Sequence, residues 1–202
     1  MTKSATLKTS RDRRIFLAGV SSVGKTTVGS RLARLLYCRF FDLDFEIERF
    51  FGSSIERIQN RYLTSHSFRL AASQVLQHAL SREDARSCVI ALPPSGLMGA
   101  YWKVVSKAQD ATIVVLKDTP ENTLERIRFY DIDSRPIERN LSDREKSLYL
   151  REIRKDIAYF SRSFQKAHLC VDVAGSGPDE AARKVSDALS VTGVTGTSHA
   201  SH

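Results

Sequence analysis

Short apolar runs and helical stripes of apolar residues alternate along this chain. The run Ile15-Phe16-Leu17-Ala18 is continuous and ends at Gly19, as expected for a strand that a parallel sheet buries on both faces. From Lys25 onward, apolar residues recur at helical spacing, as in a helix that packs on such a sheet; they are Val28, Leu32, Leu35 and Leu36. The pattern predicts a strand, a glycine loop and a helix, in that order.

Later segments have the same strand-like character, and helical stripes separate them. They are Phe40-Phe41, Cys88 to Leu92, Ala111 to Leu116 and Leu169 to Val173. Strands that alternate with helices are typical of α/β proteins with a parallel sheet. We therefore expect an α/β fold, a three-layer sandwich around a five-stranded parallel sheet.

The helices between these strands have recognisable faces and caps. Two faces should cover the sheet, one formed by Ala71, Ala72, Val75, Leu76 and Ala79, the other by Leu97, Tyr101, Val104, Val105 and Ala108. Thr119-Pro120 begins a helix that we expect to end near Arg128. Ser142 and Glu145 have the spacing of a capping box, which predicts a long helix. A last helix is predicted from Gly177-Pro178-Asp179.

Size and composition favour one domain. A chain of 202 residues with 42% hydrophobic and 27% charged residues has ordinary values for a single globular domain. We expect this domain at 14–190, between a basic flexible tail at 1–13 and a disordered tail at 191–202. No apolar run approaches the roughly 18 residues that a membrane helix needs. The polar N-terminus also lacks the pattern of a secretory signal, so the cytoplasm is the expected location.

The charge and the cysteines narrow the choice of partners. Half of the formal net charge of +8 comes from the first fourteen residues, which we interpret as solvated; contact with nucleic acid or an acidic partner is the alternative. The remaining basic residues suit an anionic substrate. Cys38, Cys88 and Cys170 are widely spaced, and we expect buried free thiols rather than a metal or redox site.

The strongest chemical signal is a phosphate-binding motif. Residues 19–26 match G-x-x-x-x-G-K-[ST] between the predicted strand and helix. Glycines let the backbone amides and the helix N-terminus surround a polyphosphate. Lys25 should reach the β- and γ-phosphates, and Thr26 should ligate a bridging magnesium ion; the alternative is a glycine turn with an exposed lysine. The expected nucleotide contacts are Gly19, Val20, Ser21, Ser22, Val23, Gly24, Lys25, Thr26 and Thr27.

Two acidic residues follow the second predicted strand. Asp42 and Asp44 should lie on one extended segment directly after Phe41. Because the carboxyl ends of parallel strands face the ligand crevice, we expect both near the phosphate loop. One can hold magnesium, and the other can accept a proton from a hydroxyl that attacks the γ-phosphate. The alternative is that both cap the strand end in solvent.

Several motifs point together to one family. They are Lys25-Thr26-Thr27-Val28-Gly29, Phe41-Asp42-Leu43-Asp44 with Ile47-Glu48, Gly52-Ser53-Ser54-Ile55 and Phe68-Arg69. Over about residues 13 to 190 the chain resembles the shikimate kinase family, which has the architecture of nucleoside monophosphate kinases. The resemblance implies an ATP- and magnesium-dependent P-loop kinase of aromatic amino acid biosynthesis, with a mobile lid at about 129–145, that phosphorylates a hydroxyl of shikimate.

The resemblance also implies roles for individual residues. Asp42 would help to bind magnesium, Asp44 would contact the substrate hydroxyl and Arg69 would bind the shikimate carboxylate. Arg128 and Arg135 reproduce the spacing of the adenine-side and lid arginines, with ordinary surface basicity as the alternative. The catalytic residues would then be Lys25, Asp44 and Arg135, and the metal ligands Thr26 and Asp42.

A second carboxylate-binding arginine is expected after the lid. Arg154 is at about the right distance, and Arg151 and Arg162 are the alternatives. The expected acceptor contacts are thus Asp44, Arg69, Ser95, Gly96 and Arg154.

The chain departs from the family pattern on the acceptor side. Pro93-Pro94-Ser95 replaces a glycine triplet, and proline has no amide hydrogen to donate. Ala72 replaces the glutamate that would hold Arg69. Tyr101 and Trp102 follow the proline loop; we assign them to the core, with the acceptor pocket as the alternative. The acceptor site is therefore expected to diverge from that of the family.

Three hypotheses for function remain. The first is a kinase that phosphorylates shikimate, and the second a kinase for another sugar acid, polyol or nucleotide. The third is an ATP-binding regulator without catalysis. The expected ligands are ATP, Mg²⁺ and a small hydroxylated acceptor, without a membrane or nucleic-acid partner. The sequence leaves the oligomeric state open, and a monomer is the default expectation.

Overall fold

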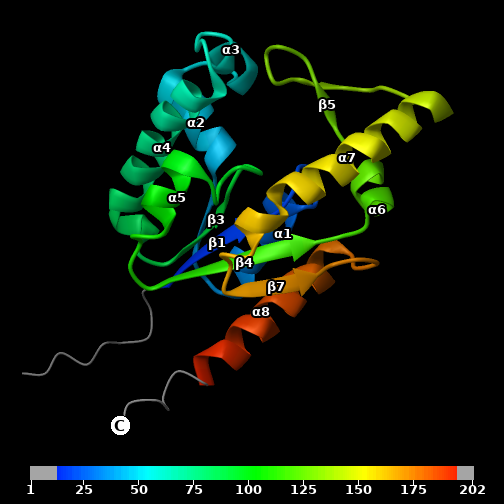
Figure 1. The fold of residues 1–202 in the computed structure, drawn as a ribbon. Coiled ribbons are helices and arrows are strands. Elements are labelled where there is room, and N and C mark those ends of the chain that lie inside the picture. Colours follow the sequence, from blue (N-terminus) through cyan, green and yellow to red (C-terminus); the bar gives the residue numbers. More distant parts are fainter. Residues whose placement is uncertain (1–12, 195–202) are drawn as a thin grey trace, which may run out of the picture.

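A computed structural model describes residues 13–194 of the chain, with side chains as far as residue 191. A five-stranded sheet forms its centre (Figure 1). The strands, in spatial order, are β2 (Arg39–Asp42), β3 (Cys88–Ala91), β1 (Arg14–Ala18), β4 (Ala111–Lys117) and β7 (Leu169–Asp172). Each neighbouring pair is parallel, which confirms the predicted α/β fold.

Helices cover both faces of this sheet. They are α1 (Lys25–Leu35), α2 (Leu43–Phe51), α3 (Ile55–Gln59), α4 (Ser65–Ser81), α5 (Gly99–Val105), α6 (Pro120–Glu125), α7 (Asp143–Phe164) and α8 (Pro178–Val194), with a 3₁₀ helix at Glu83–Ala85. In Figure 1, α2 to α5 lie on one side of the strands and α8 on the other. The arrangement is the predicted three-layer sandwich.

The central strand β1 shows why its apolar run is continuous. Phe16 and Ala18 belong to a buried cluster that includes residues of α2, α4 and α5. Ile15 and Leu17 point to the opposite face, in a second cluster with residues of α1 and α8. All four side chains are at most 1% exposed. Because alternate residues of a strand face opposite ways, a strand between two helical layers must be apolar at every position.

The segment after β2 differs from the prediction. Helix α2 begins at Leu43, so Asp44 lies in its first turn rather than in an extended segment. The Asp42 side chain accepts a hydrogen bond from the Asp44 amide at 3.0 Å and caps the helix. Aspartate is among the preferred N-cap residues. Because Asp42 caps a helix, Asp42 and Asp44 do not lie on one extended segment as predicted.

Some predicted helix ends also shift. Helix α6 ends at Glu125, before Arg128, and strand β5 (Phe129–Tyr130) follows shortly after it. Helix α5 spans Gly99–Val105, which is shorter than the predicted apolar face. Helix α8 continues to Val194, beyond the last inward residue of the predicted stripe, Leu189.

The predicted lid region forms a hairpin and a helix start. Strands β5 and β6 (Pro136–Ile137) pair in antiparallel fashion. The capping box that begins α7 is confirmed: Ser142 Oγ accepts from the Glu145 amide, and a Glu145 carboxylate oxygen accepts from the Ser142 amide at 2.9 Å.

The predicted tails lie mostly outside the described residues. Within them, Arg13 donates to Thr112 Oγ1 at 3.4 Å and to the carbonyl of Leu189 at 3.3 Å. Residues 191–194 belong to α8 rather than to a tail. The folded part therefore extends slightly beyond both predicted limits.

The three cysteines are free but differ in exposure. Cys88 is buried and Cys38 is half-buried, whereas Cys170 is exposed. The prediction of a buried thiol is wrong for Cys170, because it lies on the edge strand β7, where alternate residues face solvent. Among residues 13–194, no helix is both long and apolar enough to cross a membrane.

Candidate active site

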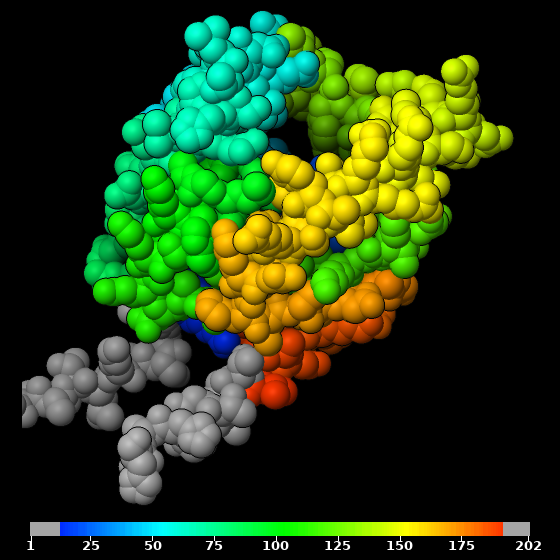
Figure 2. All heavy atoms as spheres, in the orientation of Figure 1, coloured from blue at the N-terminus to red at the C-terminus, as the bar shows by residue number. Residues whose placement is uncertain are grey.

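A large cavity lies at the carboxyl ends of the strands. It has a volume of about 1010 Å³ and is lined by the loop after β1, the start of α1, and residues that follow β2, β3 and β7. Figure 2 shows the molecule hollowed between the cyan segment around α3 and the yellow helix α7. Ligands of open α/β sheets bind at this end of the strands. We call this space the donor cavity.

The phosphate loop has the backbone shape that its glycines permit. Gly19 and Gly24 have φ values of 145° and 105°, a region that side chains with a Cβ rarely adopt. A Cβ at Gly19 would also lie 2.8 Å from the carbonyl oxygen of Leu116. Ser22, at φ 59°, adds a left-handed residue to the same loop. Helix α1 begins directly after Gly24 and presents its N-terminus to the donor cavity.

Lys25 lies at the floor of this loop. Its Nζ donates to the carbonyls of Gly19 at 3.0 Å and Val20 at 2.7 Å. Burial lowers the pKa of Lys25 to about 8, against the opposing effect of the Asp44 and Asp42 carboxylates. A phosphate group would favour the charged ammonium in the same way. The position suits a cation that neutralises a polyphosphate.

Thr26 and Asp42 form the candidate magnesium site. The Thr26 hydroxyl donates to Asp42 Oδ2 at 2.5 Å, and both residues line the donor cavity. A hydroxyl and a carboxylate are hard oxygen ligands, and Mg²⁺ is typically held by one or two carboxylates together with substrate phosphates. No cluster of three or more acidic, histidine or cysteine side chains that could hold a metal occurs at 13–194. The donor set therefore fits a magnesium ion that arrives with its nucleotide.

Asp44 is the carboxylate of the donor cavity that is best suited to accept a proton. Asp44 is exposed to the cavity, yet its pKa is raised to about 6, chiefly because the surrounding protein partly desolvates the carboxylate. The charges of Asp42 and Glu48 also raise this pKa, and the charge of Lys25 lowers it. A carboxyl with this pKa is ionised at neutral pH and still able to accept a proton.

A second cavity of about 530 Å³ adjoins the first. Its lining comes mainly from α3, α4, the segment between them and the loop after β3. Both cavities are lined by Asp44, Ile55, Pro93 and Pro94. We call the second space the acceptor cavity, because a group bound there would meet a phosphate in the donor cavity beside Asp44.

Arg69 is in the acceptor cavity, as expected. It is half-buried, and no described carboxylate lies within ion-pair distance of it. Ala72, which follows on the same helix, is 0% exposed and packs in the core. The guanidinium of Arg69 is thus available to an anionic ligand.

Two predicted acceptor contacts lie elsewhere. Arg154 donates to Glu121 Oε1 at 2.7 Å on the exposed side of α7. The buried Gly96 uses its amide for a hydrogen bond of 2.8 Å to the carbonyl of Pro93 and does not line the cavity, whereas Ser95 does. The alternatives Arg151 and Arg162 are exposed and outside the lining as well.

Helix α7 instead contributes an aromatic side chain. Phe160 lines the acceptor cavity and stacks on Phe164, with ring centroids 5.8 Å apart. The helix turns about 100° per residue, so the face that Phe160 shares with Ile153 and Ile157 differs from the face of Arg154. The predicted arginine was chosen by its distance along the sequence, and the phase of the helix places Phe160 at the site.

The two arginines of the lid region differ in position. Arg128 lines the donor cavity. Arg135 is exposed and does not line it, although its neighbour Ser134 does. The Arg135 amide donates to Asp131 Oδ1 at 2.9 Å, which fixes the turn that carries it.

Three contacts hold this turn against α2 and α3; we call them the lid contacts. Arg57 Nε donates to Asp133 Oδ1 at 2.7 Å, Ser134 Oγ donates to Glu48 Oε1 at 2.5 Å, and Ser54 Oγ donates to the carbonyl of Ile132. The lid region therefore adjoins the acceptor side as well as the donor cavity.

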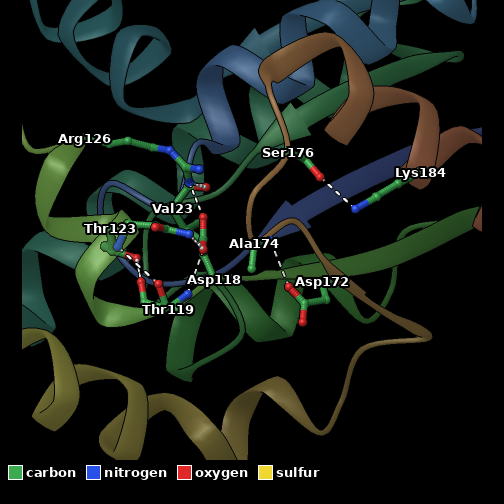
Figure 3. Close-up of polar contacts among 10 residues, drawn as sticks. Val23, Asp118, Thr119, Thr123, Arg126, Asp172, Ala174, Ser176 and Lys184 are labelled. Carbon is green, nitrogen blue, oxygen red and sulfur yellow. Dashed lines mark hydrogen bonds and ion pairs between the residues drawn. The ribbon is translucent and has the colours of Figure 1, made fainter.

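Sequence reasoning missed Asp118 and Arg126. The Asp118 side chain is 0% exposed and forms an ion pair with Arg126, which also donates to the carbonyl of Val23 in the phosphate loop (Figure 3). Asp118 further accepts from the Thr119 amide at 2.7 Å and from Asn122 Nδ2 at 2.8 Å. Asp118 directly follows a buried strand, the same signal that identified Asp42.

The loop after β7 was also missed as part of the donor cavity. Ser176 and Pro178 line it, and Ser176 Oγ accepts from Lys184 Nζ at 2.7 Å (Figure 3). The same loop is shaped by Asp172, whose Oδ1 accepts from the Ala174 amide at 2.8 Å. The position at the carboxyl end of a strand could have indicated this loop.

Known proteins resemble this chain in sequence and fold. The family model for shikimate kinase matches residues 21–190. The chain belongs to the shikimate kinase family. A shikimate kinase from Chlorobium chlorochromatii is 32% identical over 179 residues, which cover 85% of this chain and 90% of that protein.

Solved structures of the shikimate kinase family agree with the fold. The shikimate kinase of Aquifex aeolicus has a TM-score of 0.64 at 27% identity and covers 91% of this chain and 99% of its own. The Acinetobacter baumannii shikimate kinase, solved in complex with shikimate, has a TM-score of 0.69 at 24% identity, with 89% and 94% covered. The predicted family and the P-loop kinase fold are both confirmed.

Proposed function

We propose that this protein transfers the γ-phosphoryl group of ATP, in the presence of Mg²⁺, to a hydroxyl of shikimate. The observation that carries the proposal is that the donor and acceptor cavities meet at Asp44. Phosphoryl transfer depends on positioning and charge neutralisation, and the lining of both cavities supplies groups for each.

On the donor side, the phosphate loop and Lys25 would hold the triphosphate. The amides at the start of α1 and the ammonium of Lys25 would face the negative charge of the β- and γ-phosphates. Thr26 and Asp42 would hold the magnesium ion, which neutralises charge on the phosphates when bound. Arg128 and Arg126 would lie along the nucleotide.

On the acceptor side, Arg69 would bind the carboxylate and Asp44 the reacting hydroxyl. The hydroxyl oxygen forms a bond to the γ-phosphorus while the bond from that phosphorus to the β-γ bridging oxygen breaks, which releases ADP. The hydroxyl proton passes to a carboxylate oxygen of Asp44. Ser95 lines the same cavity and would be a further contact.

The lid region would complete the site. Movement of the 129–145 segment would bring Arg135 from its exposed position toward the transferring phosphoryl group and exclude water. We further propose that the protein acts as a monomer in the cytoplasm, without a nucleic-acid partner.

A steady-state assay of ADP release tests the proposed function. ATP, Mg²⁺ and shikimate should give turnover that requires all three, and other hydroxylated acids, sugars and nucleosides should be poorer. Lys25→Ala should lower kcat by about 10²-fold or more, because one preorganised charged contact contributes about that much, while the fold is retained. Near-normal turnover by this variant would contradict the assignment.

A second candidate is a kinase for another small hydroxylated acid. Two observations favour it: Pro93 and Pro94 have no amide hydrogen, and helix α7 contributes Phe160 to the acceptor cavity rather than the expected arginine. The same acceptor panel separates the candidates. A preferred acceptor other than shikimate would support the second and leave the phosphoryl-transfer chemistry intact.

A further inference from the structure

The acceptor cavity has few charged groups. Asp44 and Arg69 are the charged residues of its lining, and aromatic or proline side chains form much of the rest: Tyr62, Phe68, Pro93, Pro94, Tyr101 and Phe160. Such a lining suits a compact ring with one anionic group. The groups that recognise the other hydroxyls of such a ligand must come from the neutral polar residues of the lining.

The loop after β3 can supply few of these groups. Pro93 and Pro94 have no amide hydrogen. The amide of Gly96 donates to the carbonyl of Pro93 at 2.8 Å, and the amide of Met98 donates to the carbonyl of Ser95 at 2.9 Å. The loop therefore offers few free backbone amides to a ligand, because two of its residues have none and two amides bond within the turn.

Tyr101 is a polar residue buried beside this loop. It is 1% exposed, lies on α5 and lines the acceptor cavity. Its hydroxyl makes no hydrogen bond with any described residue. Every fully buried side-chain oxygen or nitrogen of the described residues has a hydrogen-bond partner. The hydroxyl oxygen is therefore not fully enclosed by protein, and it faces the cavity that Tyr101 lines.

Tyr101 shares the lining of the cavity with its two charged residues, Asp44 and Arg69. Burial raises the pKa of Tyr101, and the charges of Asp44 and Arg69 both act on it, in opposite directions. The phenol is therefore neutral at any physiological pH and keeps one proton to donate. A buried tyrosine hydroxyl normally has a partner, and here that partner must come from the cavity.

Building on the proposed function, we propose that Tyr101 is a specificity-determining residue whose hydroxyl hydrogen-bonds a hydroxyl of the acceptor. It takes over recognition that the Pro93-Pro94 backbone cannot provide. The ligand class is a small ring with one carboxylate, held by Arg69, and with one hydroxyl near Asp44 and another near Tyr101. The apolar face of the ring lies against the aromatic lining.

The test is Tyr101→Phe, which keeps the ring and its packing and removes the hydroxyl alone. The matched control is Tyr37→Phe, because Tyr37 is 98% exposed and lies outside both cavities. We expect the dissociation constant of shikimate, measured by calorimetry, and its KM to rise about 3- to 10-fold in Tyr101→Phe, the cost of one hydrogen bond. The KM for ATP and the thermal midpoint should stay at the wild-type values.

Deoxy analogues of shikimate separate recognition from a merely structural role. An analogue that lacks the contacted hydroxyl should bind wild type and Tyr101→Phe equally, whereas analogues that lack a different hydroxyl should keep the difference between the two proteins. Equal binding of shikimate by wild type and Tyr101→Phe would overturn the inference and leave the proposed function standing.

The proposed function can fail separately. If wild type binds shikimate and the variant binds it more weakly, but no acceptor is phosphorylated, the inference holds and the catalytic proposal is wrong. If wild type binds no acceptor of the panel, both are overturned.

Discussion

Asp42 has two duties in this site, and they can be separated. Its carboxylate accepts from the Thr26 hydroxyl and from the Asp44 amide, so it both faces the metal position and caps α2. Asparagine is an equally good N-cap but lacks the charge that attracts Mg²⁺. Asp42→Asn should therefore raise the magnesium concentration for half-maximal turnover about tenfold or more and leave the thermal midpoint nearly unchanged.

A magnesium titration of turnover, together with thermal unfolding, checks this prediction. Asp110→Asn serves as the control, because Asp110 is exposed and outside both cavities. An unchanged magnesium requirement in Asp42→Asn would show that this carboxylate takes no part in holding the ion.

The raised pKa of Asp44 predicts the acid side of the pH profile. The ionised carboxylate accepts the hydroxyl proton, so kcat/KM for the acceptor should fall as the pH drops through about 6. Asp44→Asn should lower kcat by about 10²-fold or more and remove this acid limb. A profile that stays flat down to pH 5 in the wild type, with intact protein, would contradict the role of Asp44 as the base.

The same shift has a consequence for stability. Asp44 binds its proton more tightly in the folded state than in the unfolded state, so its contribution to stability decreases as the pH rises from about 4 to about 6. Above about pH 6 the carboxylate is ionised and only partly solvated, which lowers the stability of the ligand-free protein; the effect is small because Asp44 is exposed to solvent in the cavity. Asp44→Asn should therefore raise the thermal midpoint at pH 7.5 and raise it much less at pH 4; a lower midpoint at pH 7.5 would contradict the burial argument.

At the scale of single residues, most of the residues predicted from the phosphate-loop motif line the donor cavity, whereas only some of the predicted acceptor contacts line the acceptor cavity. The positions of Lys25, Thr26 and Asp42 follow from a motif of fixed spacing on a short strand-loop-helix unit. Arg154 was placed by its distance along the chain alone. Whether a helical residue faces a cavity depends on the phase of the helix, and no motif fixes that phase for α7.

At the scale of elements, the lid contacts connect the 129–145 segment to the acceptor side. Arg57 and Asp133 are each about half exposed, and exposed ion pairs contribute roughly 0.2–1 kcal/mol. Arg57→Ala should therefore lower kcat/KM by at most about fivefold, because the lid region is then held less firmly beside the acceptor cavity. The loss should shrink at 1 M salt, where the wild-type pair is screened as well.

The control for this prediction is Arg31→Ala. It breaks a comparable exposed pair, Arg31 with Asp179 at 3.1 Å, between α1 and α8. Steady-state kinetics at low and high salt compare the two variants. Equal losses in both, or none in Arg57→Ala, would mean that the Arg57–Asp133 contact does not position the lid.

Elements were predictable where local signals and packing agree. The capping box of Ser142 and Glu145 marked the start of α7, and the alternating faces of β1 marked a strand between two layers. The start of α2 was missed because Asp42 belongs both to the strand end and to the helix cap. The hairpin β5–β6 has only two residues in each strand, too few to give a periodic signal.

At the scale of the whole molecule, the fold places two cavities at one edge of the sheet. The order β2-β3-β1-β4-β7 puts β1 in the middle, with the phosphate loop after it and the residues of β2 and β3 on one side. The donor and acceptor cavities share Asp44, Ile55, Pro93 and Pro94 for this reason. The sheet and its layers were predictable from hydrophobic patterning, whereas the cavity walls depend on tertiary packing.

The central claim is that a phosphoryl group crosses from one cavity to the other beside Asp44. The most direct test is mass spectrometry of shikimate after incubation with the wild-type protein, ATP and Mg²⁺, with ADP measured in the same sample. The account predicts that shikimate gains one phosphoryl group for each ADP formed. ATP that binds but phosphorylates neither shikimate nor any other acceptor of the panel would contradict it.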